Sequence, residues 1–274
     1  MTTLSEFWAS ANTFFWISLA ISSVTSLALG YLASVLSAPH ARRFTDRVEG
    51  RAVRDLLRLN GADVIVVVPH QPGPQNRRLP QLAIEDVLAL RNVFDILAEV
   101  GIKHPKIRHP ENLSDTDLKK DIISIGGSSR NVFTAEVLKA PVNGDILEFV
   151  QSSTHDGQIE LRRGTTTVYH SPSYTEPPSE QPRAPSKDVA FILRRPNPKN
   201  ETASVLLLAG IRGIGTWGAS DHLRKHSKAL AERVARDQGR AMHHGFIALL
   251  EVEYENFDIA RTKVKDIASI LDDE

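Results

Sequence analysis

Glycine, arginine and threonine gather in one short segment, residues 209–219, with the sequence AGIRGIGTWGA. It contains a Gly-x-Gly-x-x-Gly pattern formed by Gly213, Gly215 and Gly218. The segment follows an apolar run and opens a helical pattern, and in that context backbone amides can approach a phosphate. We expect Thr216 to be the N-cap of the helix, with a hydroxyl that serves either the helix or a ligand oxygen, and Arg212 to pair with an anionic group. A tight turn that needs glycine for its geometry alone is an open alternative. NAD binding also requires an acidic residue about 20 positions later, and the acids that end the next predicted strand, Glu251 and Glu253, come more than 30 residues after the motif.

A second polar loop follows another apolar run. Asn131 tolerates unusual backbone angles, and Thr134 is expected to cap a following helix. If the two preceding strands are neighbours in one sheet, the two loops lie side by side at its carboxyl edge. This pairing predicts an anionic or nucleotide ligand, and the contacting residues predicted for the second loop are Gly126, Gly127, Ser128, Ser129, Arg130, Asn131 and Thr134.

A third loop, residues 69–74, places His70 at the same predicted edge, where it is either an acid, base or hydrogen-bond donor, or a plain surface residue. Glu85 and Asp86 begin the next helical pattern, and we interpret them as favouring the helix dipole, with no catalytic role. We assign no catalytic residue. The chain has no cysteine, and the adjacent His243 and His244 would point in opposite directions on a strand, so we expect no metal site and no cofactor beyond the ligand. Patterns typical of zinc proteases, serine hydrolases and Walker NTPases are absent from the sequence.

The elements that would position these loops alternate between strands and helices. Short apolar, β-branched runs predict strands at 62–69, 121–127, 189–198, 204–210 and 246–253. Apolar residues at helical spacing predict helices at 44–59, 82–100, 217–236 and 259–271. This order predicts a Rossmann-like α/β domain with a doubly wound, mostly parallel sheet, whose ligands bind at the carboxyl ends of the strands.

The middle of the chain departs from this alternation. Three short, half-polar runs at 146–151, 159–164 and 166–171 predict an inserted β-hairpin or meander. Residues 171–187 are rich in proline and serine and predict an exposed loop, either a cover over a ligand or a solvated linker.

The N-terminal region carries a hydrophobic run, Phe14–Leu36, and no charge occurs between Phe7 and Pro39. Such a run is long enough to cross a hydrocarbon core of roughly 30 Å. Arginines follow it closely, so we predict a single-pass cell-membrane protein whose C-terminal domain is cytoplasmic. The predicted organisation is an anchor at 1–40, a juxtamembrane helix at 41–61 and the α/β domain at 62–274.

Small residues repeat along the predicted anchor at Ser18, Ser22, Ser26 and Gly30. Such a stripe permits close helix association, although serines can also bond back to the preceding turn. The 33 basic and 33 acidic residues balance, so general attraction to nucleic acid is not expected. The expected partners are therefore the lipid bilayer, further copies of the chain and a small anionic or nucleotide ligand, with no nucleic acid.

Four segments, IISIGGSSRNVFT, FILRRPNP, VLLLAGIRGIGTWGA and ALLEVE, together resemble a poorly characterised bacterial family of Rossmann-like α/β proteins. The shared pattern is GGxxxNxxT, then PNP, then LAGxxGxGT, and it covers roughly residues 62–73 and 120–260. The resemblance implies the fold and no particular reaction. One transmembrane helix before such a domain is similar in architecture to membrane effectors of nucleotide-signalling antiviral systems.

Three functional hypotheses follow from these features. The chain is a membrane-anchored sensor or effector that binds an anionic ligand, a membrane-tethered enzyme acting on a nucleotide or glycosidic substrate, or an interaction scaffold without a small ligand. The absence of a recognisable catalytic set favours the first.

Overall fold

The computed structural model describes residues 53–59, 63–70, 81–139, 147–151, 159–163, 166–170, 186–238 and 245–269. These residues all belong to one unit, Gly50–Glu274. The predicted anchor, most of the predicted juxtamembrane helix, His243, His244 and nearly all of the predicted Pro/Ser-rich loop lie outside them. Within the described part of the chain, no helix is both long and apolar enough to cross a membrane.

Seven strands form the larger sheet, in the order β10-β9-β7-β8-β3-β1-β2. Their bounds are β1 Val64–Val67, β2 Lys106–Arg108, β3 Asp121–Ile125, β7 Ser186–Asn197, β8 Asn200–Gly210, β9 Phe246–Glu255 and β10 Asp258–Ser269. The neighbours β2, β1, β3 and β8 are parallel, whereas β8, β7, β9 and β10 pair in antiparallel fashion. The α/β class is therefore confirmed, but the sheet is mixed rather than mostly parallel.

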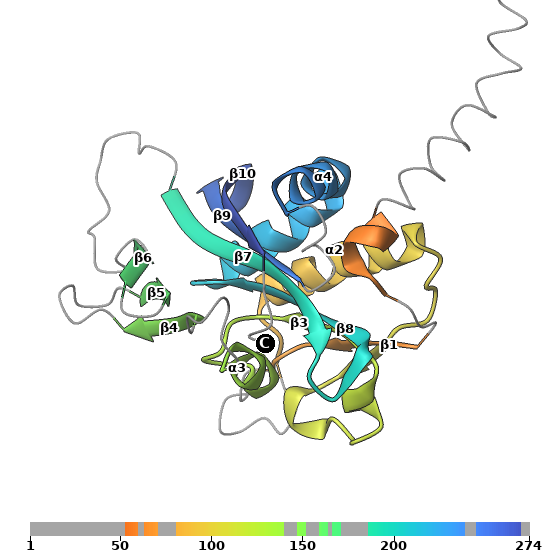
Figure 1. Ribbon diagram of the computed structural model, residues 1–274. Helices are drawn as coiled ribbons and strands as arrows, with labels where there is room; N and C mark the ends of the chain where they lie inside the picture. The colour runs from red at the N-terminus through yellow and green to blue at the C-terminus, as the bar shows by residue number, and fades with distance from the viewer. Residues whose placement is uncertain are drawn as a thin grey trace, which may run out of the picture. The chain divides into compact units, whose positions relative to one another are not determined.

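Apolar residues on successive positions of the central strands alternate between two hydrophobic clusters, one on each face of the sheet. Helices α2 (Ile84–Glu99) and α4 (Gly213–Gln238) cover one face. Helix α3 (Val132–Leu138) covers the other (Figure 1). Leu161 is buried in the cluster on that face. Strands buried on both faces must be apolar throughout, which is why the continuous apolar runs correctly predict the strands β1, β3 and β8.

The inserted segment forms a separate three-stranded antiparallel sheet in the order β4-β5-β6. Its strands are β4 Leu147–Gln151, β5 Ile159–Arg163 and β6 Thr166–His170. The predicted meander is thus confirmed, and Figure 1 shows these strands apart from the larger sheet.

The helix predicted at 259–271 is wrong, because this segment forms β10, the edge strand paired with β9. Two register shifts interrupt the pairing, between Ile259 and Arg261 and between Val264 and Asp266. Each bulge adds one residue to the strand, so Ile259, Val264 and Ile267 still pack on the core although their spacing imitates a helix. Two consecutive residues with positive φ connect β9 to β10, as in a tight hairpin turn.

Candidate functional site

Three parallel strands end together at one edge of the larger sheet. The chain leaves β1 through α2 to reach β2 on one side, and β3 pairs with β1 on the other. This change of direction is the topological switch point at which doubly wound sheets bind ligands. A cavity of about 270 Å³ lies there, lined by His70, His109, Pro110, Glu111, Arg130 and Val132.

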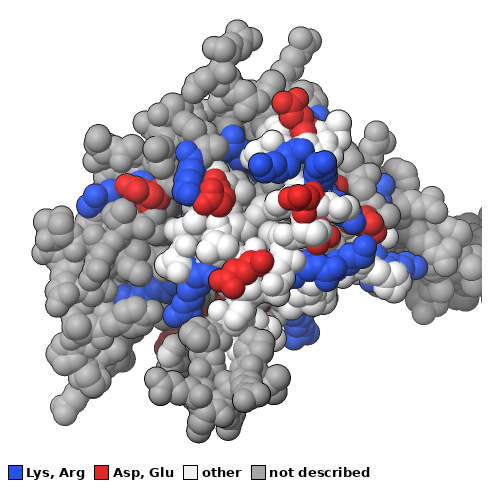
Figure 2. All heavy atoms as spheres, turned by 90° about the horizontal axis from the view of Figure 1, so that it is seen from below, with Lys and Arg blue, Asp and Glu red and all other residues white. Residues whose placement is uncertain are grey.

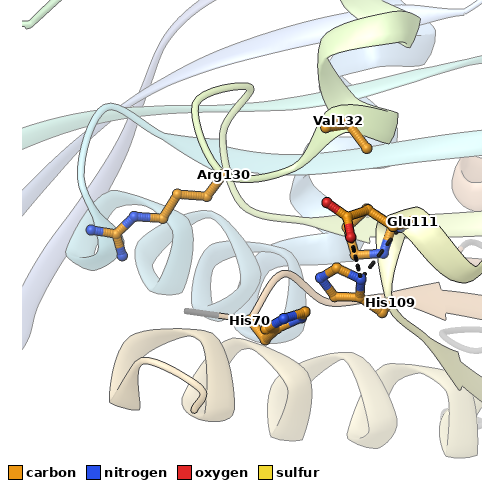
Figure 3. Close-up of a pocket in the computed structure, with 6 residues that line it drawn as sticks. His70, His109, Glu111, Arg130 and Val132 are labelled. Carbon is orange, nitrogen blue, oxygen red and sulfur yellow. Dashed lines mark hydrogen bonds and ion pairs between the residues drawn. The ribbon is translucent and has the colours of Figure 1, made fainter. Parts of the chain in front are cut away.

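Each strand end contributes to this cavity, which we call the switch-point cavity. His70 follows β1, His109 and Glu111 follow β2, and Arg130 lies on the loop between β3 and α3. In Figure 3 the Glu111 side chain turns toward His109, whereas the exposed side chain of Arg130 starts at the rim and extends away from both histidines. The residues that line the cavity thus include one arginine, one glutamate and two histidines.

The two histidines are in contact, with ring centroids 3.7 Å apart and planes at 51°. The backbone N–H of Glu111 donates a long hydrogen bond to Nδ1 of His109 at 3.4 Å, which leaves the proton of a neutral imidazole on Nε2. Burial lowers the pKa of His109, and the neighbouring His70 lowers it further. The Glu111 carboxylate, 4.0 Å from the same Nδ1, is an ion-pair partner only when His109 is protonated.

Asp86 lies in the first turn of α2, close enough to Arg130 for their charges to interact, and its side chain is buried. Burial raises the pKa of its carboxyl group to about 6, the charge of Glu85 adds to the rise, and the guanidinium of Arg130 opposes it. Sequence reasoning gave this acid no role beyond the helix dipole. Its position in the helix that follows β1 is the signal that would have placed it at the switch point.

The loop after β3 serves mainly to build the edge of the sheet. Asn131 is fully buried and caps α3: its Oδ1 accepts from the N–H of Thr134 at 3.1 Å, and its Nδ2 donates to Ser124 Oγ and to the Ile125 carbonyl. The hydroxyl of Thr134 bonds to that of Ser124 at 2.9 Å. Asn131, rather than Thr134, is thus the helix cap, and both side chains are occupied inside the protein.

Gly126 directly follows β3 with a φ of +95°, and a Cβ built there would lie 3.0 Å from Cγ of Pro69. The residue is therefore explained by backbone conformation and by the close passage of the chain after β1. Gly127 and Ser128 are half-buried, while Ser129 and Arg130 are exposed. Of the predicted contacts in this loop, Arg130 is the one that lines the switch-point cavity.

The loop after β8 already holds an anion, the carboxylate of Asp188 on β7. The backbone N–H groups of Gly215 and Arg212 donate to its Oδ2 at 2.8 and 3.1 Å. Its Oδ1 accepts from the N–H of Val189 at 2.8 Å. Burial raises the pKa of Asp188 to about 6 even though these amides hydrogen-bond to it. A phosphate bound by these two amides would have to displace Asp188.

The remaining features of this loop are explained by packing. Helix α4 begins at Gly213, so Thr216 lies inside its first turn and is not the predicted N-cap. The hydroxyl of Thr216 instead accepts from the N–H of Gly210 at 3.0 Å and ties the helix to the end of β8. A Cβ on Gly218 would lie 2.5 Å from Val252 of β9, and one on Gly213 would lie 3.1 Å from Glu85.

The predicted neighbourhood of the loops is confirmed, since β1, β3 and β8 are consecutive in the sheet. The structure brings His70 and Arg130 to one cavity. Internal hydrogen bonds engage the side chains of Asn131, Thr134 and Thr216 and the backbone amide of Gly215. The sequence patterns did not predict four residues of this edge: His109, Glu111, Asp86 and Asp188. Strand β2 is short and largely exposed, so no strand pattern in the sequence located His109 and Glu111, which follow it.

No protein-family model matches the chain, and no curated protein is significantly similar to it. Across the described ranges, no group of three or more histidine, aspartate or glutamate side chains is arranged to hold a metal ion. The site is therefore interpreted from its own geometry.

Proposed function

We propose that this protein is a membrane-anchored sensor or effector that binds a small anionic ligand, of the nucleotide class, in the switch-point cavity. One observation carries the proposal: His70, His109 and Arg130 come from the ends of three adjacent parallel strands and line one cavity. Ligands of open α/β sheets bind at this place.

The chemistry of the lining suits an anion that also carries hydroxyl groups. The guanidinium of Arg130 is a two-pronged donor for phosphate or carboxylate oxygens. A neutral His109 offers its Nε2 proton as a further donor. On the face drawn in Figure 2, acidic and basic side chains are interspersed, so recognition would depend on these local groups rather than on a broad basic surface.

The output of the proposed sensor is association of membrane helices. The hydrophobic run Phe14–Leu36 and its small-residue stripe support this part of the proposal. Ligand binding changes the balance between packing states of the domain only if the ligand prefers one of them. Antiviral defence is the setting that the architecture suggests for such a device.

Binding and output are tested on the full-length chain purified in detergent, by isothermal titration calorimetry with a panel of mono-, di- and cyclic nucleotides. We expect Arg130→Gln to weaken binding at least tenfold. The matched control is Arg91→Gln, which removes an exposed arginine from α2 and should leave affinity unchanged. Cross-linking in vesicles should then increase with ligand. Absence of binding by every nucleotide, or equal loss in both variants, would contradict the proposal.

A second function, a membrane-tethered enzyme acting on a nucleotide or glycosidic substrate, is favoured by Asp86. A buried carboxyl with a pKa of about 6 exchanges protons near neutral pH, as a general acid or base must. Incubating bound nucleotides with the protein and following their breakdown by chromatography separates the two functions. Turnover that disappears in Asp86→Asn would establish the enzyme, while binding without turnover supports the sensor.

A further inference from the structure

A second cavity adjoins the switch-point cavity. Its volume is about 480 Å³, and it shares Pro110 and Val132 with the first. Most of its lining is apolar: Leu113, Leu118, Phe133, Val137 and Pro198. Glu136 and Lys199 are exposed polar residues of the same lining. A ligand that extends past Pro110 and Val132 would therefore pass from a charged compartment into an apolar one.

Secondary structure fixes the walls of this second cavity. Phe133 and Val137 lie four residues apart on α3 and so occupy one face of the helix. Leu113 comes from the turn after β2, and both it and Phe133 pack against the buried cluster on that side of the sheet. On the far side, Asn197 donates from Nδ2 to the carbonyls of Leu118 and Lys120, at 2.9 and 2.7 Å, and holds the turn between β7 and β8 against the segment before β3. Because these contacts belong to the folded domain, the cavity is preformed.

Glu111 restricts the kind of anion that fits the first cavity. Its carboxylate repels a bare phosphate, whereas it accepts hydrogen bonds from hydroxyl groups. The side chain is 72% exposed, so the carboxylate is accessible to a bound molecule. The lining thus favours a molecule with an anionic group for Arg130, hydroxyl groups for Glu111 and an apolar, flat portion for the compartment beside Phe133.

We propose that the ligand is a ribonucleoside phosphate that spans both cavities, with its phosphate at Arg130, its ribose hydroxyls at Glu111 and its base in the apolar cavity lined by Phe133. This assignment rests on the proposed function and adds the subsites that determine specificity. Base recognition by an apolar compartment with a polar rim is the usual arrangement of small-molecule sites.

The test compares three kinds of probe on the full-length chain in detergent by calorimetry: the four ribonucleoside 5′-monophosphates, ribose 5-phosphate and inorganic phosphate. We expect at least one nucleotide to bind ten or more times as tightly as ribose 5-phosphate, and ribose 5-phosphate to bind more tightly than phosphate. Glu111→Gln should reduce the preference for ribose 5-phosphate over inorganic phosphate. The affinity for inorganic phosphate should stay the same or increase.

The variant Glu136→Trp places a large ring at the apolar cavity without touching the first, because Glu136 lines only the second. It should abolish the advantage of the nucleotide over ribose 5-phosphate. Its matched control is Asp95→Trp, at an exposed position of α2 that lines neither cavity. Circular dichroism of both variants checks that they fold.

The outcomes separate this inference from the proposed function. Nucleotides that bind no better than ribose 5-phosphate, or an advantage that survives Glu136→Trp, overturn the assignment of the base while the anion site stands. If neither phosphate, ribose 5-phosphate nor any nucleotide binds, the proposed function itself fails and the subsites fall with it.

Discussion

Replacing Asp86 by asparagine is expected to stabilise the protein increasingly as the pH rises. The carboxyl group has a pKa near 3.8 when unfolded and about 6 in the folded protein, mainly because it is buried. Between these two values the folded state holds a proton that the unfolded state has released, so wild-type stability falls as the pH increases. Asparagine does not titrate and escapes this loss.

The magnitude follows from the same pKa shift. A displacement from 3.8 to about 6 corresponds to roughly 3 kcal/mol when it is fully developed. Between about pH 4.5 and about pH 7.5 the wild type loses roughly 2 kcal/mol of unfolding free energy through this group. The side chain is only 6% exposed, so solvent screening removes little of the effect.

The assay is urea denaturation of full-length wild type and Asp86→Asn at several pH values, followed by circular dichroism. The difference in unfolding free energy should grow by roughly 2 kcal/mol in favour of the variant across that range. Asp95→Asn removes an exposed carboxylate from the same helix and should show a much smaller change, because solvent screens it. A difference for Asp86→Asn that stays constant with pH would refute the reasoning.

Three further substitutions test how the loops are built. Asp188→Ala leaves the buried loop amides without their acceptor and should cost about 2–4 kcal/mol in urea denaturation. Full stability of the variant would contradict this structural role, and selective stabilisation of the variant by phosphate would indicate that these amides hold an anionic ligand. Asn131→Ala removes the α3 cap and two further hydrogen bonds and should cost about 2–3 kcal/mol, against less than about 0.5 kcal/mol for the exposed Ser129→Ala. Equal melting temperatures for these two variants would contradict the structural role of Asn131. Gly126→Ala forces a side chain into positive φ and should cost about 1–3 kcal/mol, seen as a lower melting temperature; an unchanged value would refute the strain.

Sequence patterns predicted the elements whose burial makes them apolar. The runs at β1, β3, β8 and β9 must be apolar because helices or a second layer cover the sheet, so composition alone located them. The helical spacing of apolar residues in α2 and the half-polar runs of the meander also predicted these elements correctly. The edge strands were not: β2 is three residues long and largely exposed, and the bulges of β10 give its apolar residues a helical spacing.

The candidate site divides in the same way. Local sequence patterns are enough to predict that glycine-rich and polar loops follow buried strands, and therefore that His70 and Arg130 belong to the carboxyl edge of the sheet. Which polar groups face a cavity depends on how distant segments pack together. Asp188 reaches the amides after β8 from a strand that is antiparallel to β8, a contact between residues 24 and 27 positions apart that no local pattern encodes. Burial, which sets the proton affinity of Asp86, is likewise a property of packed neighbours and not of the residue's own position in the chain.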